Sequence, residues 1–132
     1  MNGIWQLRYG FQLSGLYFFG SGVRLSTQYG TDLAGRGVPQ GERRLRPNGT
    51  IVDRNNFVGK PIHRVDLRLQ RRFPLGGRAG IDGILEIFNV FNHANYESYV
   101  VQEVARNYGQ PSQSTNVAYT PRALQLGFRL TF

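Results

Sequence analysis

The chain has 132 residues, 40% hydrophobic and 13% aromatic, which bounds it to one modest domain and excludes a disordered protein. It has no cysteine, which excludes disulfides, CxxC redox chemistry and zinc sites built from thiolates. The net charge is +8, and Lys60 is the only lysine. Such an arginine-rich chain fits a nucleic-acid surface, or a polar lumen and anionic lipid headgroups. The arginines alternate along the predicted strands, which favours the second.

The amino-terminal segment contains no targeting signal. The sequence has no run of about 18 apolar residues that could form a membrane helix. Residues 1–6 lack the basic segment and the apolar core of a signal peptide. Because secreted and outer-membrane proteins need such a signal, we expect either a cytosolic protein or the tail of a longer one. The chain starts inside an apolar pattern, which favours a tail.

The first part of the chain predicts the end of a strand at residues 2–5, a turn at 6–9 and a long strand over 10–28. Periodicity alone would also permit one strand from Ile4 onward. The strand over 10–28 places apolar side chains on one parity, interrupted by Leu16 and Phe18. It would extend ~60 Å at ~3.3 Å per residue, which suits a barrel strand projecting beyond a membrane better than a soluble domain. Residues 30–59 have no sustained period and predict a long loop.

Residues 61–73 predict a strand with two different faces. Arg71 breaks its apolar face, but near the strand end, where a long side chain can reach the membrane interface. Residues 74–80 predict a short turn. The apolar face carries Val65, Leu67, Leu69 and Phe73, and the polar face carries Arg64, Asp66, Arg68, Gln70 and Arg72.

Residues 81–92 alternate poorly, because Ile84 and Phe88 share the parity of Glu86. A helix is an alternative, but β-branched and aromatic residues beside glycines favour a strand. Either both faces are partly covered, or a bulge switches the register. Residues 93–120 predict a second long loop with a possible β-extension at 99–104.

Residues 121–132 give the clearest strand, with Leu124 and the four apolar residues that follow at alternate positions on one face. Its length is about the 9–11 residues that cross a bilayer as a tilted strand. A half-buried strand of a soluble β domain is the alternative on alternation alone. Short turns and long loops alternate along the chain, as in transmembrane barrels. We therefore predict an all-β antiparallel meander of four long strands plus an N-terminal stub.

Three segments resemble the C-terminal end of TonB-dependent outer-membrane receptors, particularly the subgroup with carboxypeptidase-regulatory-like N-terminal domains. They are residues 9–22 (Y-G-F-Q-L-S-G-L-Y-F-F-G-S-G), residues 85–96 (L-E-I-F-N-V-F-N-H-A-N-Y, with its paired Phe-Asn) and the closing strand, which ends at Phe132. Residues 6–9 (Q-L-R-Y) depart from the Leu-Pro turn that is commoner in that family.

The resemblance implies that residues 1–132 are the closing part of a large transmembrane β-barrel in the bacterial outer membrane. That barrel would have ~22 strands, with its plug domain and earlier strands upstream. The implied function is energised uptake of a bulky solute. The implied partners are membrane lipid, the rest of the barrel and plug, TonB and the outer-membrane assembly machinery, and not nucleic acid. Four strands alone would leave two unpaired edges, which lipid does not tolerate.

Three sets of side chains are predicted as sites. The lumen-facing set is Arg64, Asp66, Arg68, Gln70, Glu86, Gln125 and Arg129. The resemblance implies a C-terminal assembly signal at Leu126, Phe128, Leu130 and Phe132. An aromatic girdle is predicted from Trp5, Tyr9, Phe11, Phe73 and Phe132 at the periplasmic rim and from Phe91, Tyr96 and Tyr119 at the outer rim. The alternative for these aromatics is that they fill a core.

Catalytic chemistry is not predicted, and we expect neither an enzyme nor a cofactor. No G-x-S-x-G, H-E-x-x-H or Walker sequence occurs. His63 and His93 would need two further converging donors to hold a metal. The carboxylates Asp66, Asp82 and Glu86 could serve acid–base chemistry. We prefer charge pairing with the arginines of the same face, which are Arg64, Arg68 and Arg129.

Two other functions are alternatives to the predicted receptor barrel. A soluble basic β module would bind nucleic acid through arginine and stacked aromatic side chains. A small stand-alone barrel would need about eight strands, which is more than the sequence predicts.

Overall fold

The computed structural model describes all residues of the chain except 31, 34, 36, 38–43 and 113–119. The chain divides into two units, each described here by itself. The first comprises Met1–Gly20, Ile62–Ala94 and Thr120–Phe132, and the second comprises Ser21–Pro61 and Asn95–Tyr119. No helix in the described ranges is long and apolar enough to cross a membrane.

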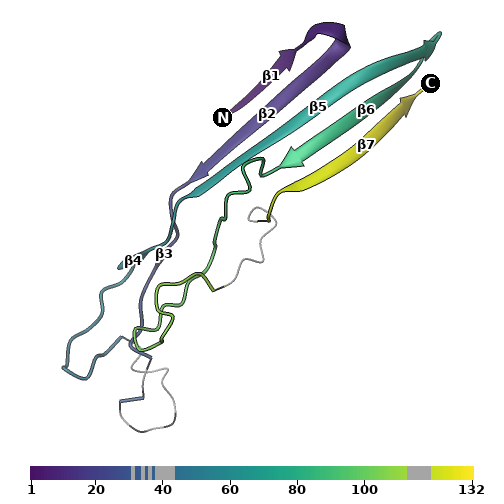
Figure 1. Ribbon diagram of the computed structural model, residues 1–132. Helices are drawn as coiled ribbons and strands as arrows, with labels where there is room; N and C mark the ends of the chain where they lie inside the picture. The colour runs from purple at the N-terminus through teal and green to yellow at the C-terminus, as the bar shows by residue number, and fades with distance from the viewer. Residues whose placement is uncertain (31, 34, 36, 38–43, 113–119) are drawn as a thin grey trace. The chain divides into compact units, whose positions relative to one another are not determined.

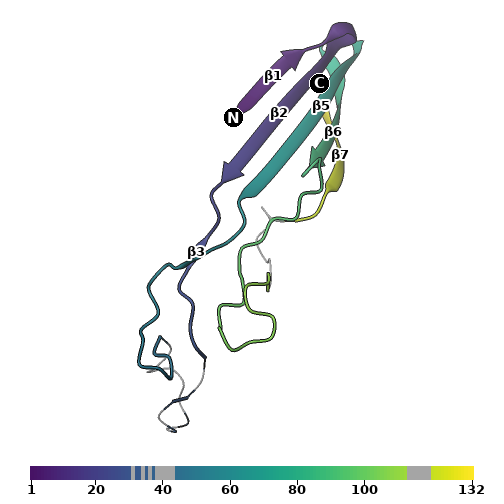
Figure 2. The ribbon, with the colours of Figure 1, turned by 60° about the vertical axis from the view of Figure 1, so that its left-hand side comes forward.

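The first unit is one twisted antiparallel sheet, seen from two sides in Figure 1 and Figure 2. The predicted all-β meander of four long strands and a stub is confirmed. The sheet is not closed, since β1 and β7 are its two edges. In spatial order the strands are β1 (Asn2–Gln6), β2 (Phe11–Gly20), β5 (Ile62–Gly76), β6 (Ala79–Phe88) and β7 (Ala123–Thr131).

Two short turns and the carboxyl terminus lie at the same end of this sheet (Figure 1). The first turn contains the 3-10 segment η1 (Arg8–Gly10), within which Tyr9 has φ 63°. The second is a two-residue hairpin turn in which Gly77 has φ 56°, a conformation that glycine adopts without steric cost. The prediction of a turn over 74–80 is therefore too wide. β5 continues through a register shift between Pro74 and Gly76, and β6 begins at Ala79.

The strand predicted over 10–28 is present but much shorter than predicted, because β2 ends at Gly20. In the second unit the chain then forms β3 (Arg24–Leu25), which pairs with β4 (Phe57–Val58). Just before β3, the backbones of Gly22 and Gly59 come so close that a Cβ on Gly22 would lie 1.8 Å from the Gly59 carbonyl oxygen. This close approach requires glycine. The alternation of apolar residues in the sequence does not predict it.

The β-extension predicted at 99–104 is also wrong. Tyr99 and Gln102 make only isolated bridges, to Pro111 and Gln28 respectively. Where described, the rest of the predicted long loops lacks strands other than β4. Backbone hydrogen bonds, such as those from Gln28 N to Val101 O and from Glu103 N to Gln28 O, join segments of this second unit. Side chains join further segments, as described below.

The segment with poor alternation is a strand, and the helix alternative is wrong. β6 pairs without interruption with both β5 and β7 from Ile81 onward, so no bulge switches its faces there. Ile84 and Phe88 therefore lie on the same face as Glu86. Of the two explanations for the poor alternation, partial covering of both faces agrees with the half-buried pattern along β6.

The strands are staggered along the sheet. β5 pairs with β2 over Ile62–Arg71 and with β6 over Leu67–Gly76, an offset of five residues at each end. A stagger of this kind is what tilted strands need to close into a barrel.

The sheet has no apolar core of its own. Among the described residues the buried hydrophobic side chains are Val52 and Tyr99, and both belong to the second unit. In β7, by contrast, Leu126 is 81% exposed and Phe128 is 79% exposed. A soluble β domain would bury such side chains in a shared dry centre, so the soluble alternative for this strand is not supported.

Candidate functional site: the polar face of the sheet

One face of the sheet collects the charged and amide side chains, and we call it the polar face. Strand register places Arg68 opposite Glu86, and Glu86 opposite Gln125, so three strands contribute to one row. Arg68 Nη1 lies 3.7 Å from Glu86 Oε1, and Arg68 Nη2 donates a hydrogen bond to Gln70 Oε1 at 3.1 Å. This row links β5 to β6 through side chains above the backbone ladder.

A second ion pair lies nearer the long-loop end of the same face. Arg64 Nε donates to Asp66 Oδ1 at 2.8 Å, and both side chains are largely buried. The Arg64 guanidinium also stands 5.7 Å from the ring centroid of Phe88. Asp66 Oδ1 accepts a further hydrogen bond from the backbone N–H of Asn89 at 2.9 Å. Asp66 thus joins the middle of β5 to the end of β6.

The third pair joins β6 to β7. Arg129 donates to Asp82 Oδ2 from Nη2 at 2.6 Å and from Nε at 2.9 Å. The Asp82 side chain is only 3% exposed, whereas that of Arg129 is 66% exposed. A buried carboxylate needs such a partner, because water no longer solvates it.

The charge pairing that the sequence predicts for these carboxylates is present in the structure. Each of the three carboxylates is engaged by a different arginine, and these are the arginines that the sequence predicts. Within the described ranges, no three His, Asp or Glu side chains gather to hold a metal. All seven predicted lumen-facing residues lie on the polar face by strand parity. Their assignment to a lumen stays a prediction.

The two histidines lie on the opposite face or beyond the strand ends. His63 Nδ1 is hydrogen-bonded to Tyr17 Oη at 3.0 Å, and the rings of His63 and His93 are 5.5 Å apart with an edge-to-face tilt. This is aromatic packing with a satisfied ring nitrogen.

Asn89 and Asn92, from the paired Phe-Asn motif, make the corner after β6. Both have positive φ, 51° and 50°, a conformation that asparagine tolerates better than most residues. The buried Asn89 amide donates to the carbonyl oxygens of His93 and Thr120, and its Oδ1 accepts from His93 N. Asn92 Oδ1 accepts from the backbone N–H of Arg122. The sequence marks this motif by resemblance only, and its structural role was missed.

The other face is apolar, and we call it the apolar face. Register aligns Leu13, Leu69, Leu85 and Leu126 in one row across four strands. The residues of the predicted assembly signal lie on this face of β7 or just after it and are exposed: Leu126, Phe128, Leu130 and Phe132.

The predicted aromatic girdle is only partly placed by the structure. Tyr9, Phe11 and Phe73 lie at the short-turn end of the sheet, whereas Trp5 pairs with Leu13, one step farther in. The Trp5 ring leans over Gly15, whose added Cβ would lie 3.3 Å from it. At the other end Phe91 is exposed on the corner after β6. Tyr96 belongs to the second unit, and Tyr119 lies outside the described residues.

The second unit is organised by a buried threonine. Thr27 Oγ1 donates to Glu103 Oε1 at 3.0 Å and accepts from Asn56 Nδ2 at 2.8 Å. Arg46 makes two hydrogen bonds to the Glu103 carboxylate, at 2.7 and 2.8 Å. The hydrogen bond from Arg46 lowers the pKa of Glu103 below its ordinary value, against the opposing effect of burial, and raises the pKa of Arg46. Four separate segments of the loops are thereby joined.

The sheet thus has one charged face and one apolar face. A family model for an outer membrane beta barrel domain matches residues 45–125, more than half of the chain. The chain belongs to this family of outer membrane β-barrel domains. A search of curated proteins and a search of solved structures found no match.

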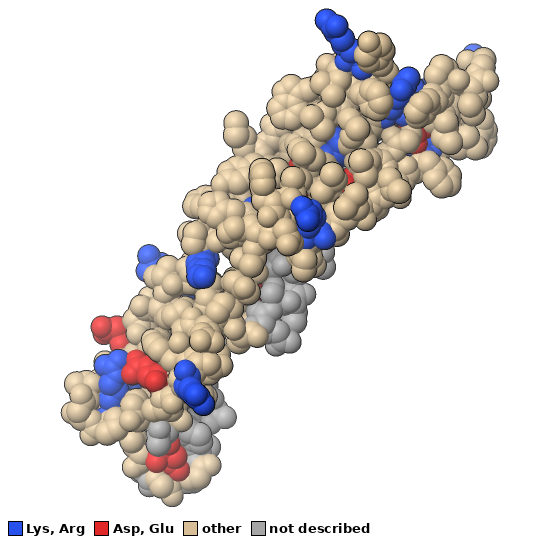
Figure 3. Space-filling view, in the orientation of Figure 1, with Lys and Arg blue, Asp and Glu red and all other residues tan. Residues whose placement is uncertain are grey.

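As an outer membrane barrel domain, the chain is located in the bacterial outer membrane and forms part of a barrel wall. Three of the arginines that suggested a nucleic-acid surface, Arg64, Arg68 and Arg129, are ion-paired within the sheet. On the view in Figure 3, cationic side chains over the sheet are few and separated by uncharged surface. The apolar face is the one that suits hydrocarbon.

Proposed function

We propose that the chain forms the closing strands of the barrel of a TonB-dependent receptor that takes up a bulky solute. The observation that carries the proposal is an open, staggered sheet with two dissimilar faces and unpaired edges at β1 and β7. Unpaired edges are costly in lipid, so further strands must complete the barrel. The strands are staggered, and the long connections all lie at one end of the sheet. A sheet with these two features can close into a large barrel with external loops.

In this proposal the polar face lines the lumen. Its carboxylates are neutralised within the wall by arginines, so the wall holds its charges in fixed positions. The uncharged amide of Gln125, and the amide nitrogen of Gln70, whose Oε1 accepts from Arg68, are proposed to exchange hydrogen bonds with water or with a passing solute. No side chain is assigned a catalytic role, and the proposed protein is a transporter without a bound cofactor.

Dependence on TonB rests on the resemblance of residues 9–22 and 85–96 to that receptor family. Within residues 85–96, Asn89 has a specific structural role, because its buried amide makes three hydrogen bonds at the corner after β6. The plug, its contact with TonB and the rest of the barrel are the proposed partners in the complete receptor. The assembly machinery is proposed to recognise the apolar residues of β7 and Phe132.

The experiment is an uptake assay on intact cells. Strains lacking the encoding gene or TonB are compared with wild type for accumulation of iron chelates, cobalamin, glycans and peptides. We expect one solute class to lose uptake in both strains, while surface binding survives loss of TonB. Uptake that needs the gene but continues without TonB would contradict the receptor proposal and indicate a passive pore.

A matched pair of variants tests the lumen assignment separately. Arg68→Trp adds bulk to the polar face, and Leu67→Trp adds it to the apolar face of the same strand. We expect the first to lower uptake and the second to leave it unchanged at equal surface level. Equal uptake by the two variants would contradict the assignment of the polar face to the lumen.

A further inference from the structure

Arg71 is the one arginine of β5 on the apolar face, where hydrocarbon is the expected neighbour. Strand parity places it in line with Leu69 and Phe73, and register places it opposite Phe11 on β2 and Gly83 on β6. No carboxylate of the described residues lies within ion-pairing distance of it. Its neighbours on both sides are strands of this chain, so its surroundings do not depend on the open edges of the sheet.

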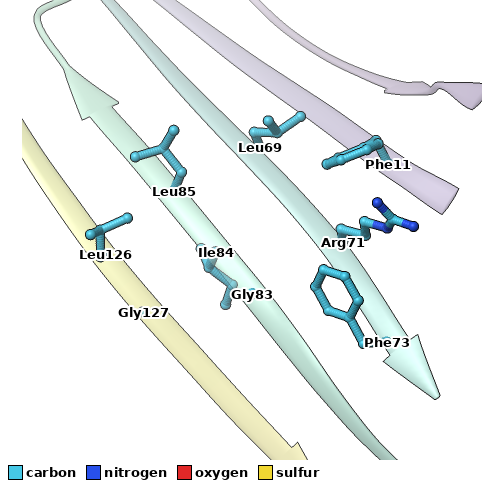
Figure 4. Close-up of a pocket in the computed structure, with 9 residues that line it drawn as sticks. All are labelled: Phe11, Leu69, Arg71, Phe73, Gly83, Ile84, Leu85, Leu126 and Gly127. Carbon is cyan, nitrogen blue, oxygen red and sulfur yellow. The ribbon is translucent and has the colours of Figure 1, made fainter. Parts of the chain in front are cut away.

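Two aromatic rings hold the guanidinium. Its central carbon lies 4.8 Å from the ring centroid of Phe11 and 4.8 Å from that of Phe73. Figure 4 shows the three side chains gathered at one side of a hollow. Cation–π contacts of this kind stabilise the cation away from water, and a stacked guanidinium keeps its N–H donors in its own plane. The Arg71 guanidinium is therefore held in a fixed position at the membrane surface, with no carboxylate of the described residues as its counter-ion.

Beside this cation is an open apolar depression of about 300 Å³. It exists because Gly83 has no side chain in the row between Arg71 and Phe128. A Cβ added to Gly83 would meet one neighbouring atom within 4 Å, a ring carbon of Phe73 at 3.5 Å. The walls are Leu69, Leu85 and Leu126 from three strands (Figure 4). The hollow has the apolar lining that an acyl chain needs.

The position of the cluster along the strand fits a lipid headgroup. From Phe73 to His63 the apolar face extends ~33 Å along β5, or roughly 25 Å across the membrane at the usual tilt. Arg71 lies one alternate position inside Phe73, at the short-turn end, and short turns of outer membrane barrels are periplasmic. An arginine at this depth reaches the interface with its guanidinium while its stem lies along apolar surface.

We infer that Arg71, Phe11, Phe73 and the hollow at Gly83 form a binding site for an anionic glycerophospholipid of the periplasmic leaflet. The lipid phosphate accepts hydrogen bonds from the Arg71 guanidinium, and an acyl chain occupies the hollow. The inference rests on the barrel fold and membrane location, and it holds whether or not the barrel depends on TonB.

The test is native mass spectrometry of the intact protein in detergent, titrated with phosphatidylglycerol or phosphatidylcholine. We expect tighter binding of phosphatidylglycerol, and Arg71→Gln should weaken it by about fivefold, the usual effect of one basic side chain at a membrane surface. The matched control is Arg72→Gln, on the polar face of the same strand, which should leave binding unchanged. Equal effects of the two variants, or equal affinity for both lipids, would overturn the inference.

A second pair of variants tests the hollow without altering charge. Gly83→Leu fills it, whereas Ala123→Leu places the same side chain on the polar face of β7, away from the hollow. We expect only Gly83→Leu to weaken phosphatidylglycerol binding. If Arg71→Gln fails to fold, this pair together with Arg71→Lys decides the question. The same variants are also titrated with a phosphorylated glycolipid of the outer leaflet. If Arg71→Gln weakened binding of that glycolipid and left phosphatidylglycerol binding unchanged, the placement at the periplasmic end would be overturned.

Discussion

The amide nitrogen of Asn89 lies 3.1 Å from the carbonyl oxygen of Thr120, so the residue that follows β6 also fixes the approach to β7. The chain between them spans 31 positions and includes the second long loop. Asn89 therefore closes the base of that loop on the sheet side. Its own backbone N–H is taken up by Asp66 of β5, which ties three strands to one corner.

Replacing Asn89 should destabilise the sheet more than replacing Asn92. Asn89→Ala removes the three hydrogen bonds of a buried amide and replaces a residue that tolerates φ 51° with one that tolerates it less well, which together cost about 2–3 kcal/mol. Asn89→Gly keeps the favourable φ and should cost less. Urea unfolding of the intact protein in detergent micelles measures the difference. Asn92→Ala, at an exposed site with the same sign of φ, is the control, and an equal loss in it would contradict this role for Asn89.

The pair of Asp82 and Arg129 should respond asymmetrically to mutation. Arg129→Leu removes the partner of the Asp82 carboxylate, which is 3% exposed, and should lower the free energy of unfolding by about 1–3 kcal/mol. Asp82→Asn frees an arginine that reaches water, and its cost should be smaller. The double variant should recover part of the loss from Arg129→Leu. Unfolding free energies that simply add would show that the two side chains are not coupled.

How far the sequence predicts this structure depends on which force fixes each part. The faces of β5 and β7 follow from alternation, because one face must meet lipid. The faces of β6 do not follow, since Ile84 is placed beside Glu86 by register with two neighbouring strands. The end of β2 was missed because it depends on the contact between the Gly22 and Gly59 backbones. The ion pairs were predictable from parity, and the hydrogen bonds of Asn89 were not.

Acid should loosen the second unit through Glu103. Its pKa is lowered in the folded state by the hydrogen bond from Arg46, so the unfolded state binds the proton more readily. The stability that ionised Glu103 contributes to the second unit is therefore fully present above the ordinary pKa of 4.5. It is lost as the pH falls through the lower pKa of the folded state. Amide hydrogen exchange at Gln28 and Glu103, corrected for intrinsic rates, should show protection that falls on acidification. Glu103→Gln should remove this pH dependence, and its persistence in that variant would assign it to another group.

The terminal aromatic should matter for assembly. Phe132 is 98% exposed and makes no packing contribution to the sheet that would explain its presence. Phe132→Ala should therefore lower the amount of folded protein in the outer membrane without changing the unfolding of the molecules that do assemble. Heat-modifiable mobility on gels measures the folded fraction. Thr131→Ala is the control, and unchanged membrane levels in Phe132→Ala would show that the terminal ring is dispensable.

The central claim is that alternate residues of one strand meet lipid and water, and spin labels on β7 test it most directly. The chain has no cysteine, so single cysteines at Leu124, Gln125, Leu126 and Arg129 can be labelled in a cysteine-free background of the intact protein in bilayers. We predict that labels at 124 and 126 collide with oxygen dissolved in lipid, and that labels at 125 and 129 collide with a water-soluble nickel complex. Equal accessibility at even and odd positions, or labels at 124 and 126 shielded from both reagents, would contradict the two-faced barrel wall.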